Sequence, residues 1–258
     1  MNAARQGSLR IVGIIPSRMA ASRLPGKPLA RIAGLPMIEH IFRRASMSPL
    51  FAEVVMATCD REIVEASEAF GCRAIMTSAT HVRGTERVAE AARAVPADVY
   101  VNIQGDEPLL RPEIFDPLLA PFLSGEPVSV TNLKLRLTSQ AELDNPNNVK
   151  VVASLAGDAL YFSRASIPTE TGARRDGYGF RQIGIYAFTA RALQQFVELP
   201  QSPHEQLESC DMMRFVDNGI PVRMVEHTAP LQSVDTPEDL AAAERLMAAD
   251  DLAPRYLR

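Results

Sequence analysis

Short apolar runs rich in β-branched residues alternate with segments of helical spacing through the first half of the chain. The first run, residues 9–15, is typical of a strand buried on both faces of a parallel sheet. Further strands are predicted over residues 53–58, 73–76 and 99–103, and the helices between them over residues 37–46, 61–70 and 84–94. Such alternation predicts an α/β fold, a doubly wound and mostly parallel sheet.

The second half of the chain has a different rhythm. After a helix over 113–122 and a strand over 129–137, the apolar runs of residues 149–189 are short and enclose a polar, glycine-containing stretch, 169–179, which we expect to be a mobile loop. Helices follow over 191–198, 204–218 and 236–248, the last capped by Asp235 or Thr236, with a strand over 222–226 between the last two. We predict a single domain, with a main α/β core at about 9–137 and 204–248 and a smaller strand-rich lobe at about 138–203.

Composition excludes several classes of protein. Hydrophobic residues make up 47% and charged residues 22% of the 258 residues, as in ordinary globular proteins. The formal net charge of -4 and the lack of a basic stripe argue against a nucleic-acid partner. Without an apolar leader or a long apolar run, we expect no membrane partner and a cytoplasmic location. Three cysteines without C-x-x-C spacing indicate neither a zinc site nor a disulfide framework.

The loop after the first strand, residues 16–28, has the composition of a phosphate-binding segment. A strand, a sharp loop and a helix hold phosphate well because backbone N–H groups and the helix N-terminus both point toward the anion. Arg18, Arg23 and Lys27 add three positive charges to this loop. It is not a Walker A loop, since Ala21 replaces the required glycine and Pro28 follows the lysine, and no G-x-G-x-x-G dinucleotide motif is present.

Six motifs then occur in order along most of the chain. The first is I-P-x-R-x-x-x-S-R-L-P-G-K-P-L at residues 15–29; the others are H-V-R-G-T-E-R at 81–87, V-N-I-Q-G-D-E-P at 101–108, A-L-Y-F-S-R-A at 159–165, G-I-Y at 184–186 and V-D-T-P-E-D-L at 234–240. The set resembles the 3-deoxy-manno-octulosonate (KDO) cytidylyltransferases, enzymes that couple the CMP part of CTP to a sugar acid and release pyrophosphate. The resemblance implies a fold like that of nucleotide-diphospho-sugar transferases, and a homodimer.

The resemblance also implies roles for individual residues. Asp106, just past a predicted buried strand, and Asp235 would be the ligands of Mg²⁺, a cation that prefers hard oxygen ligands. Asp235 has an alternative interpretation as a helix cap. Arg18, Lys27 and Asp106 would be the catalytic residues. The cations would neutralise charge on the triphosphate and the departing pyrophosphate. No general base is evident, and a metal beside the acceptor oxygen would make one unnecessary.

The expected binding residues fall into two groups. Those for the nucleotide are Arg18, Ser22, Arg23, Lys27, Ala57, Thr58, His81, Arg83, Gly84 and Gln104. Those for the acceptor, a small acidic molecule, are Gln104, Arg164, Gln182, Tyr186, Glu208 and Asp211. The other three histidines, His40, His204 and His227, are expected to be surface or packing residues.

The acceptor motifs depart from the family pattern. Gln182 replaces a histidine, Asp211 and Met212 replace glutamate and glutamine, and Arg83 replaces a serine. Two acceptors therefore stay open: KDO or a similar ulosonic acid, and a small phosphonate acid such as phosphonoformate in a specialised pathway, which fewer hydroxyl partners and an extra arginine would suit. A regulatory or scaffold protein without activity is a third hypothesis, but it predicts damaged metal and phosphate positions, and these are intact.

Overall fold

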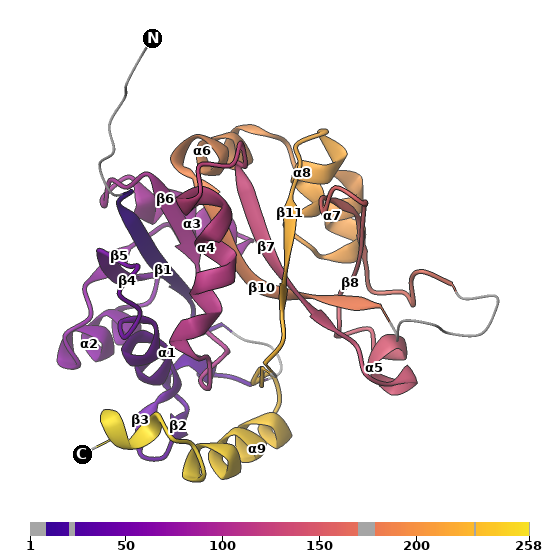
Figure 1. The fold of residues 1–258 in the computed structure, drawn as a ribbon. Coiled ribbons are helices and arrows are strands. Elements are labelled where there is room, and N and C mark those ends of the chain that lie inside the picture. The colour runs from indigo at the N-terminus through magenta and orange to yellow at the C-terminus, as the bar shows by residue number, and fades with distance from the viewer. Residues whose placement is uncertain (1–8, 21–23, 170–178, 230, 258) are drawn as a thin grey trace.

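In a computed structural model, the described residues are 9–20, 24–169, 179–229 and 231–257. The first strand of the large sheet is β1 (Ile11–Ser17), an interior strand that pairs in parallel with β4 (Glu53–Thr58) and β6 (Val99–Asn102). Strand β5 (Ala74–Met76) pairs in parallel with β4 at one edge. These four strands come from the first half of the chain, and their carboxyl ends lie at the same edge of the sheet (Figure 1).

The other half of the sheet is mixed. Strand β10 (Phe180–Thr189) runs antiparallel between β6 and β7 (Val130–Arg136), and β11 (Arg223–His227) pairs in parallel with β7. Strands β8 (Lys150–Ala153) and β9 (Ala159–Ser163) extend the sheet from β10. The order is β11-β7-β10-β6-β1-β4-β5. Because β10 is reversed, its first half approaches the edge at which the parallel strands end.

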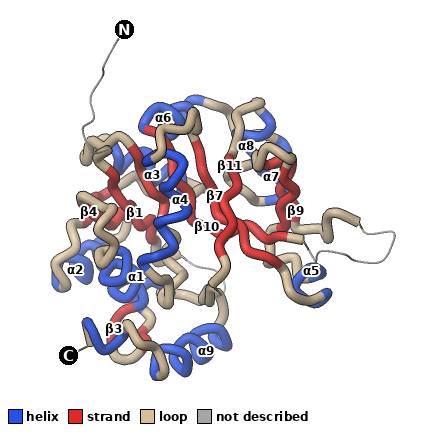
Figure 2. The backbone as a smooth tube through the Cα atoms, viewed as in Figure 1, coloured by secondary structure: helices blue, strands red, loops and turns tan. Residues whose placement is uncertain are grey.

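Helices cover both faces of this sheet (Figure 2). One core contains side chains from α1 (Met37–Ala45), α2 (Arg61–Ala69), α4 (Phe115–Leu123) and α9 (Pro237–Ala248). The opposite core contains side chains from α3 (Gly84–Ala92), α6 (Ala190–Glu198) and α8 (Met213–Asp217). Strand β1 serves both: Ile11 and Ile15 belong to the first core, and Val12 and Ile14 to the second. This period of two is that of a strand buried on both faces, and the predicted doubly wound α/β class is confirmed.

Several local predictions differ from the structure. The single helix expected over 204–218 is two helices, α7 (Pro203–Glu208) and α8, because Ser209 ends the first one in the left-handed region, with φ of 49°. The break turns residues 209–211 toward α3. A short helix, α5 (Gln140–Asp144), and a hairpin of β2 (Arg31–Ile32) and β3 (Leu35–Pro36) were not predicted.

The segment that we assigned to a smaller lobe, 138–203, supplies β8, β9 and α5 as well as β10, which lies within the main sheet. The division into core and lobe stays a prediction. The loop expected at 169–179 falls almost wholly outside the described residues. No helix of the described part of the chain is both long and apolar enough to traverse a lipid bilayer.

Candidate active site

A cavity of about 320 Å³ opens where β1 and β6 end. It is bounded by the loop after β1, the start of α3 and the residues that follow β6. Of the predicted residues, it is lined by Arg18, Lys27, His81, Arg83, Gly84, Gln104, Asp106 and Asp235. Segments far apart in sequence therefore meet at the carboxyl edge of the sheet, where open α/β sheets bind ligands. We call this space the nucleotide-side cavity.

Lys27 joins the two predicted metal ligands. Its Nζ lies 3.1 Å from Oδ2 of Asp106 and 3.0 Å from Oδ1 of Asp235, and its side chain is 14% exposed. Burial alone would lower the pKa of Lys27, but the two carboxylates outweigh it, and the pKa is raised above its usual value. The lysine is thus a fixed positive charge, and the two aspartates converge on one point beside the phosphate-binding loop.

Asp235 is available for this contact because its neighbour caps the helix. Oγ1 of Thr236 accepts a hydrogen bond of 3.2 Å from the backbone N–H of Asp239, so Thr236 is the N-cap of α9. The Asp239 carboxylate in turn accepts from the backbone N–H groups of Asp235 and Thr236. The alternative interpretation of Asp235 as a helix cap is therefore wrong.

Two bonds join the loop after β6 to the segment before α9. The N–H of Val234 donates to the carbonyl of Asp106 at 2.9 Å, and the hydroxyl of Ser233 donates to Oε1 of Glu107. Glu107 is only 4% exposed. Burial, with the nearby Asp106 carboxylate, raises its pKa to about 8. These bonds fix the spacing of the Asp106 and Asp235 carboxylates. Glu107 stands in the V-N-I-Q-G-D-E-P motif, but the sequence had given no sign of this role.

The donor set at this point fits a hard divalent cation. Mg²⁺ is commonly held by one or two carboxylates together with substrate phosphate oxygens and water. Asp106 and Asp235 provide two carboxylates, and the ammonium of Lys27 already bridges them as a cation. Among the described residues there is no group of three or more His, Cys, Asp and Glu side chains that could bind a metal unaided, so substrate would have to complete the coordination.

Not all of the other residues predicted to bind the nucleotide line this cavity. Ala57 and Thr58 are fully buried at the end of β4. They line neither the nucleotide-side cavity nor the second cavity beside it. Oγ1 of Thr58 instead accepts a hydrogen bond from the backbone N–H of Asp60. The Asp60 carboxylate in turn accepts a hydrogen bond from the N–H of Met19 in the loop after β1. Ser22 and Arg23 lie outside the described residues.

A second cavity of about 330 Å³ shares a wall with the first. Both are lined by Arg83, Gly84, Gln104, Asp106 and Asp235. The second also contains the predicted acceptor residues Arg164, Gln182, Tyr186 and Asp211, together with Arg181, Glu107 and Asn148, which sequence reasoning missed. We call it the acceptor-side cavity. Arg181 lies three residues before the G-I-Y motif at 184–186, and its position there was the only signal for it in the sequence.

Gln104 stands between the two cavities because Gly184 leaves room for it. A Cβ atom at position 184 would lie 2.7 Å from Cγ of Gln104, closer than real Cβ contacts. Any other residue there would displace this side chain. The glycine of the G-I-Y motif is therefore explained by close approach to Gln104.

Gln182, where the family pattern has histidine, is engaged by the protein itself. Its Nε2 donates to Oδ1 of Asn132 at 2.8 Å, and its Oε1 accepts from Sγ of Cys210 at 3.2 Å. Glu208 does not line the cavity; it accepts bonds of 2.8 Å from the Ser163 hydroxyl and from the N–H of Arg164. Gln182 is thus a fixed part of the cavity wall, and Glu208 supports the wall from behind.

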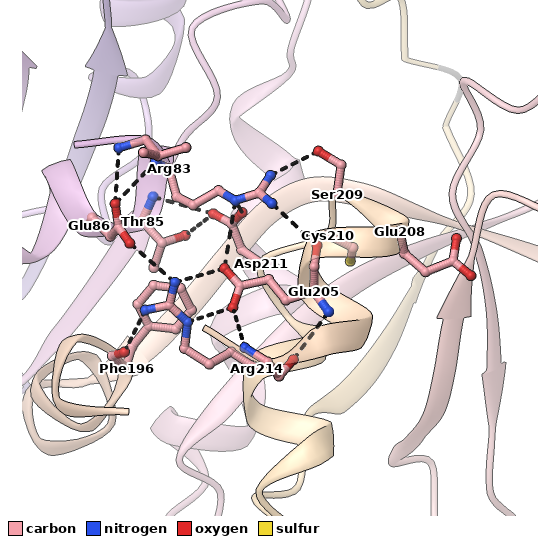
Figure 3. Close-up of polar contacts among 12 residues, drawn as sticks. Arg83, Thr85, Glu86, Phe196, Glu205, Glu208, Ser209, Cys210, Asp211 and Arg214 are labelled. Carbon is pink, nitrogen blue, oxygen red and sulfur yellow. Dashed lines mark hydrogen bonds and ion pairs between the residues drawn. The ribbon is translucent and has the colours of Figure 1, made fainter. Parts of the chain in front are cut away.

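A buried charge network supports the far side of this wall (Figure 3). Nε and Nη2 of Arg214 each donate at 2.7 Å to the Glu205 carboxylate, a bidentate pair with side-chain exposures of 3% and 0%. Nη2 also reaches Glu86 at 3.1 Å. Asp211 accepts a 2.7 Å bond from the Thr85 hydroxyl, and burial raises the pKa of this aspartate. The network ties α3 to α7 and α8.

The fold and the paired cavities define a nucleotidyltransferase. The solved structure of the inositol-1-phosphate CTP transferase from T. maritima shares this fold at 16% identity, with a TM-score of 0.66 over 95% of this chain and 97% of that one. A family model described as cytidylyltransferase matches residues 12–227.

More similar proteins narrow the assignment. A 3-deoxy-manno-octulosonate cytidylyltransferase of Lawsonia intracellularis is 46% identical over 92% of this chain and 93% of its own length. The solved structure of a CMP:2-keto-3-deoxy-manno-octonic acid synthetase complexed with CTP is 42% identical, with a TM-score of 0.88 over 93% of this chain and 99% of that one. The chain belongs to the 3-deoxy-manno-octulosonate cytidylyltransferase family. The predicted family and enzyme class are confirmed.

Proposed function

We propose that this enzyme transfers CMP from CTP to KDO and releases pyrophosphate, with Mg²⁺ as its cation. The observation that carries the proposal is Lys27, held between Asp106 and Asp235 where the two cavities meet. A triphosphate in the nucleotide-side cavity and a sugar acid in the acceptor-side cavity would have their reacting ends at that meeting point. The relatives' names state the same nucleotide and the same acid.

Attack at the α-phosphorus adds negative charge to oxygens that already carry it, so fixed cations lower the barrier. Lys27 supplies one positive charge, because Asp106 and Asp235 raise the pKa of its ammonium group. Arg18 lines the same cavity. Asp106 and Asp235 would hold Mg²⁺, which when bound supplies positive charge beside the phosphates and lowers the pKa of a nearby hydroxyl. Gln104, on the shared wall, would orient the two substrates.

The acceptor-side cavity suits a carboxylate with several hydroxyl groups. Arg164 and Arg181 line it and would receive the acid. Asn148 and Tyr186 offer polar groups to hydroxyls. KDO carries both kinds of group, whereas phosphonoformate carries charge and no sugar hydroxyls.

The argument for a phosphonate acceptor depended on fewer hydroxyl partners and on Arg83 as an extra cation; Asn148 and Tyr186 still offer polar groups in the cavity. The guanidinium of Arg83 is engaged by Ser209 and Glu205, on the protein side of the wall. No contact of this arginine favours a second acidic group on the acceptor, so we do not carry the phosphonate forward as a second function.

Pyrophosphate release tests the proposal. Purified enzyme with CTP and Mg²⁺ is offered KDO, other ulosonic acids and phosphonoformate, and the CMP product is identified by mass spectrometry. KDO should give the highest kcat/KM. Turnover with phosphonoformate and none with KDO would reverse the assignment of the acceptor, and no turnover with any acid would support the scaffold hypothesis. The proposal also includes a homodimer located in the cytoplasm. Analytical ultracentrifugation of the purified chain tests the oligomeric state.

A further inference from the structure

Arg83 departs from the serine of the family motif, and its side chain crosses from one cavity to the wall of the other. It is the N-cap residue of α3, whose preceding residues line the nucleotide-side cavity. Nη1 donates to the hydroxyl of Ser209 at 2.8 Å, and Nη2 donates to the carbonyl of Glu205 at 3.2 Å (Figure 3). The guanidinium therefore contacts α7 and the turn after it.

The charge of Arg83 is matched on the same side. Its Nε lies 3.6 Å from Oε1 of Glu205 and 3.7 Å from Oδ1 of Asp211, and the side chain is only 16% exposed. A cation with two carboxylates this close, one fully buried and one 14% exposed, is poorly placed to bind a triphosphate as well. This geometry points away from the nucleotide role expected from the sequence.

The first turn of α3 holds the segment 209–211 at two points. Arg83 binds Ser209, and Thr85, two residues later, binds Asp211 through its hydroxyl at 2.7 Å. All three residues of the segment line the acceptor-side cavity. Ser209 has a positive φ of 49°, a conformation that a non-glycine residue keeps only where its surroundings enforce it.

We propose that Arg83 is a positioning residue that sets acceptor selectivity by fixing the turn 209–211 against the acceptor-side cavity. The inference rests on the proposed function, since it assigns the acceptor to that cavity. A serine is too short to reach α7, and a lysine has a single ammonium where arginine has a planar fork with several donors. Only the arginine spans Ser209 and the Glu205 carbonyl together.

Steady-state kinetics of Arg83→Ser and Arg83→Lys test the proposal. Arg83→Ser should raise the KM for the acceptor about 10-fold, equivalent to roughly 1.4 kcal/mol, and change the KM for CTP by less than about 2-fold. Arg83→Lys should rescue only part of the loss. Arg93→Ser, at the exposed C-terminal end of the same helix, is the matched control and should leave both constants unchanged. A larger rise in the KM for CTP, or no change in either constant, would overturn the proposal.

Hydrogen exchange provides a second test that needs no turnover. The N–H of Cys210 donates to the Glu205 carbonyl and that of Met213 to the Cys210 carbonyl, so both report on the turn. In Arg83→Ser these amides should exchange at least about 10-fold faster, while those of β1 keep their rates. Equal protection in both proteins would show that Arg83 does not fix the turn. Wild-type turnover with KDO is judged separately, so failure of the proposed function is distinguishable from failure of this inference.

Ser209→Ala removes one partner of Arg83 without uncovering a buried charge. It should shift the acceptor KM in the same direction by about 3-fold, less than Arg83→Ser does, because the guanidinium keeps its bond to the Glu205 carbonyl. If Arg83→Ser fails to fold, this variant carries the kinetic test, and an unchanged acceptor KM in it would contradict the proposal.

Discussion

The two cavities share a wall but use charge in opposite ways. On the nucleotide side, Lys27, Asp106 and Asp235 have side-chain exposures of 14%, 28% and 34%, so their charged ends meet solvent. Behind the acceptor side, Glu205 and Arg214 are 0% and 3% exposed and satisfy each other. Charge that reaches the cavity can act on a substrate, whereas charge paired inside the wall fixes the positions of its neighbours. On the proposed function, the charged groups that act on the nucleotide would thus differ from those that hold the acceptor-side wall in place.

The largest expected effect is on the nucleotide side. Asp106→Ala and Asp235→Ala should each lower kcat by about 10³-fold or more, because each would remove a proposed ligand of the cation that would stabilise the transition state. Both proteins should bind Mn²⁺ more weakly in a direct binding assay and keep the wild-type unfolding midpoint. Asp116→Ala, an exposed aspartate on α4, should behave as wild type. Near-normal turnover in either variant would remove that residue from the cation site.

Behind the acceptor-side cavity, removal of a charged side chain should lower the stability of the fold. Arg214→Met leaves the Glu205 carboxylate buried without its bidentate partner, and the free energy of unfolding should fall by about 3–5 kcal/mol. Urea denaturation followed by circular dichroism measures it. Asp251→Asn, which breaks an exposed pair with Arg111, should leave the urea midpoint unchanged. A loss of turnover in Arg214→Met with unchanged stability would contradict the comparison between the two cavities.

Lys27→Ala tests whether the lysine between the two aspartates acts on the nucleotide. It should lower kcat/KM for CTP by about 10²-fold, in line with the loss of one fixed group that stabilises charge, and alter the KM for the acceptor far less. Arg61→Ala, an exposed cation on α2, is the control. Equal losses for both substrates would mean that the phosphate-binding loop has lost its structure.

The smallest effect concerns His40, which lies far from both cavities. This residue is fully buried, with Nε2 2.7 Å from the Ile32 carbonyl and Nδ1 2.8 Å from the Tyr256 hydroxyl. Burial lowers its pKa, so below about pH 6.5 the unfolded chain binds a proton that the folded chain resists.

Stability should therefore decrease as the pH falls below 6.5, by at most about 1.4 kcal/mol per pH unit from this residue. Urea titrations at pH 5, 6 and 7 measure the slope, and His40→Gln should flatten it. An unchanged slope would show that His40 does not control stability in this range. Because neither cavity contains His40, kcat at saturating substrate should be the same for this variant and the wild type.

Sequence reasoning predicted the fold from local patterns, whereas the resemblance to a known family pointed to Lys27, Asp106 and Asp235, which lie far apart in the chain. Apolar runs define the strands, and the loop after β1 concentrates its cations within one motif. Asp235 was ambiguous because an aspartate before Thr-Pro is as good a cap as a ligand, and only the bond from Asp239 to Thr236 separates the two.

The acceptor side was harder because its contacts depend on a break in the backbone and on side-chain directions that no motif encodes. Periodicity gave no sign that Ser209 would break the helix over 204–218, since the residues on either side continue the helical spacing. The direction of Arg83 likewise depends on α7, whose position no motif in the first half of the chain encodes.

The bond between Val234 and Asp106 bears on the order in which the enzyme becomes active. Every strand of the large sheet is complete at His227, before Asp235 has been added by the ribosome. A nascent chain at that stage already contains Lys27 and Asp106 but has only one of the two carboxylates. Docking of the segment that leads into α9 supplies the other, so on the proposed function the cation site would form only after the sheet is complete.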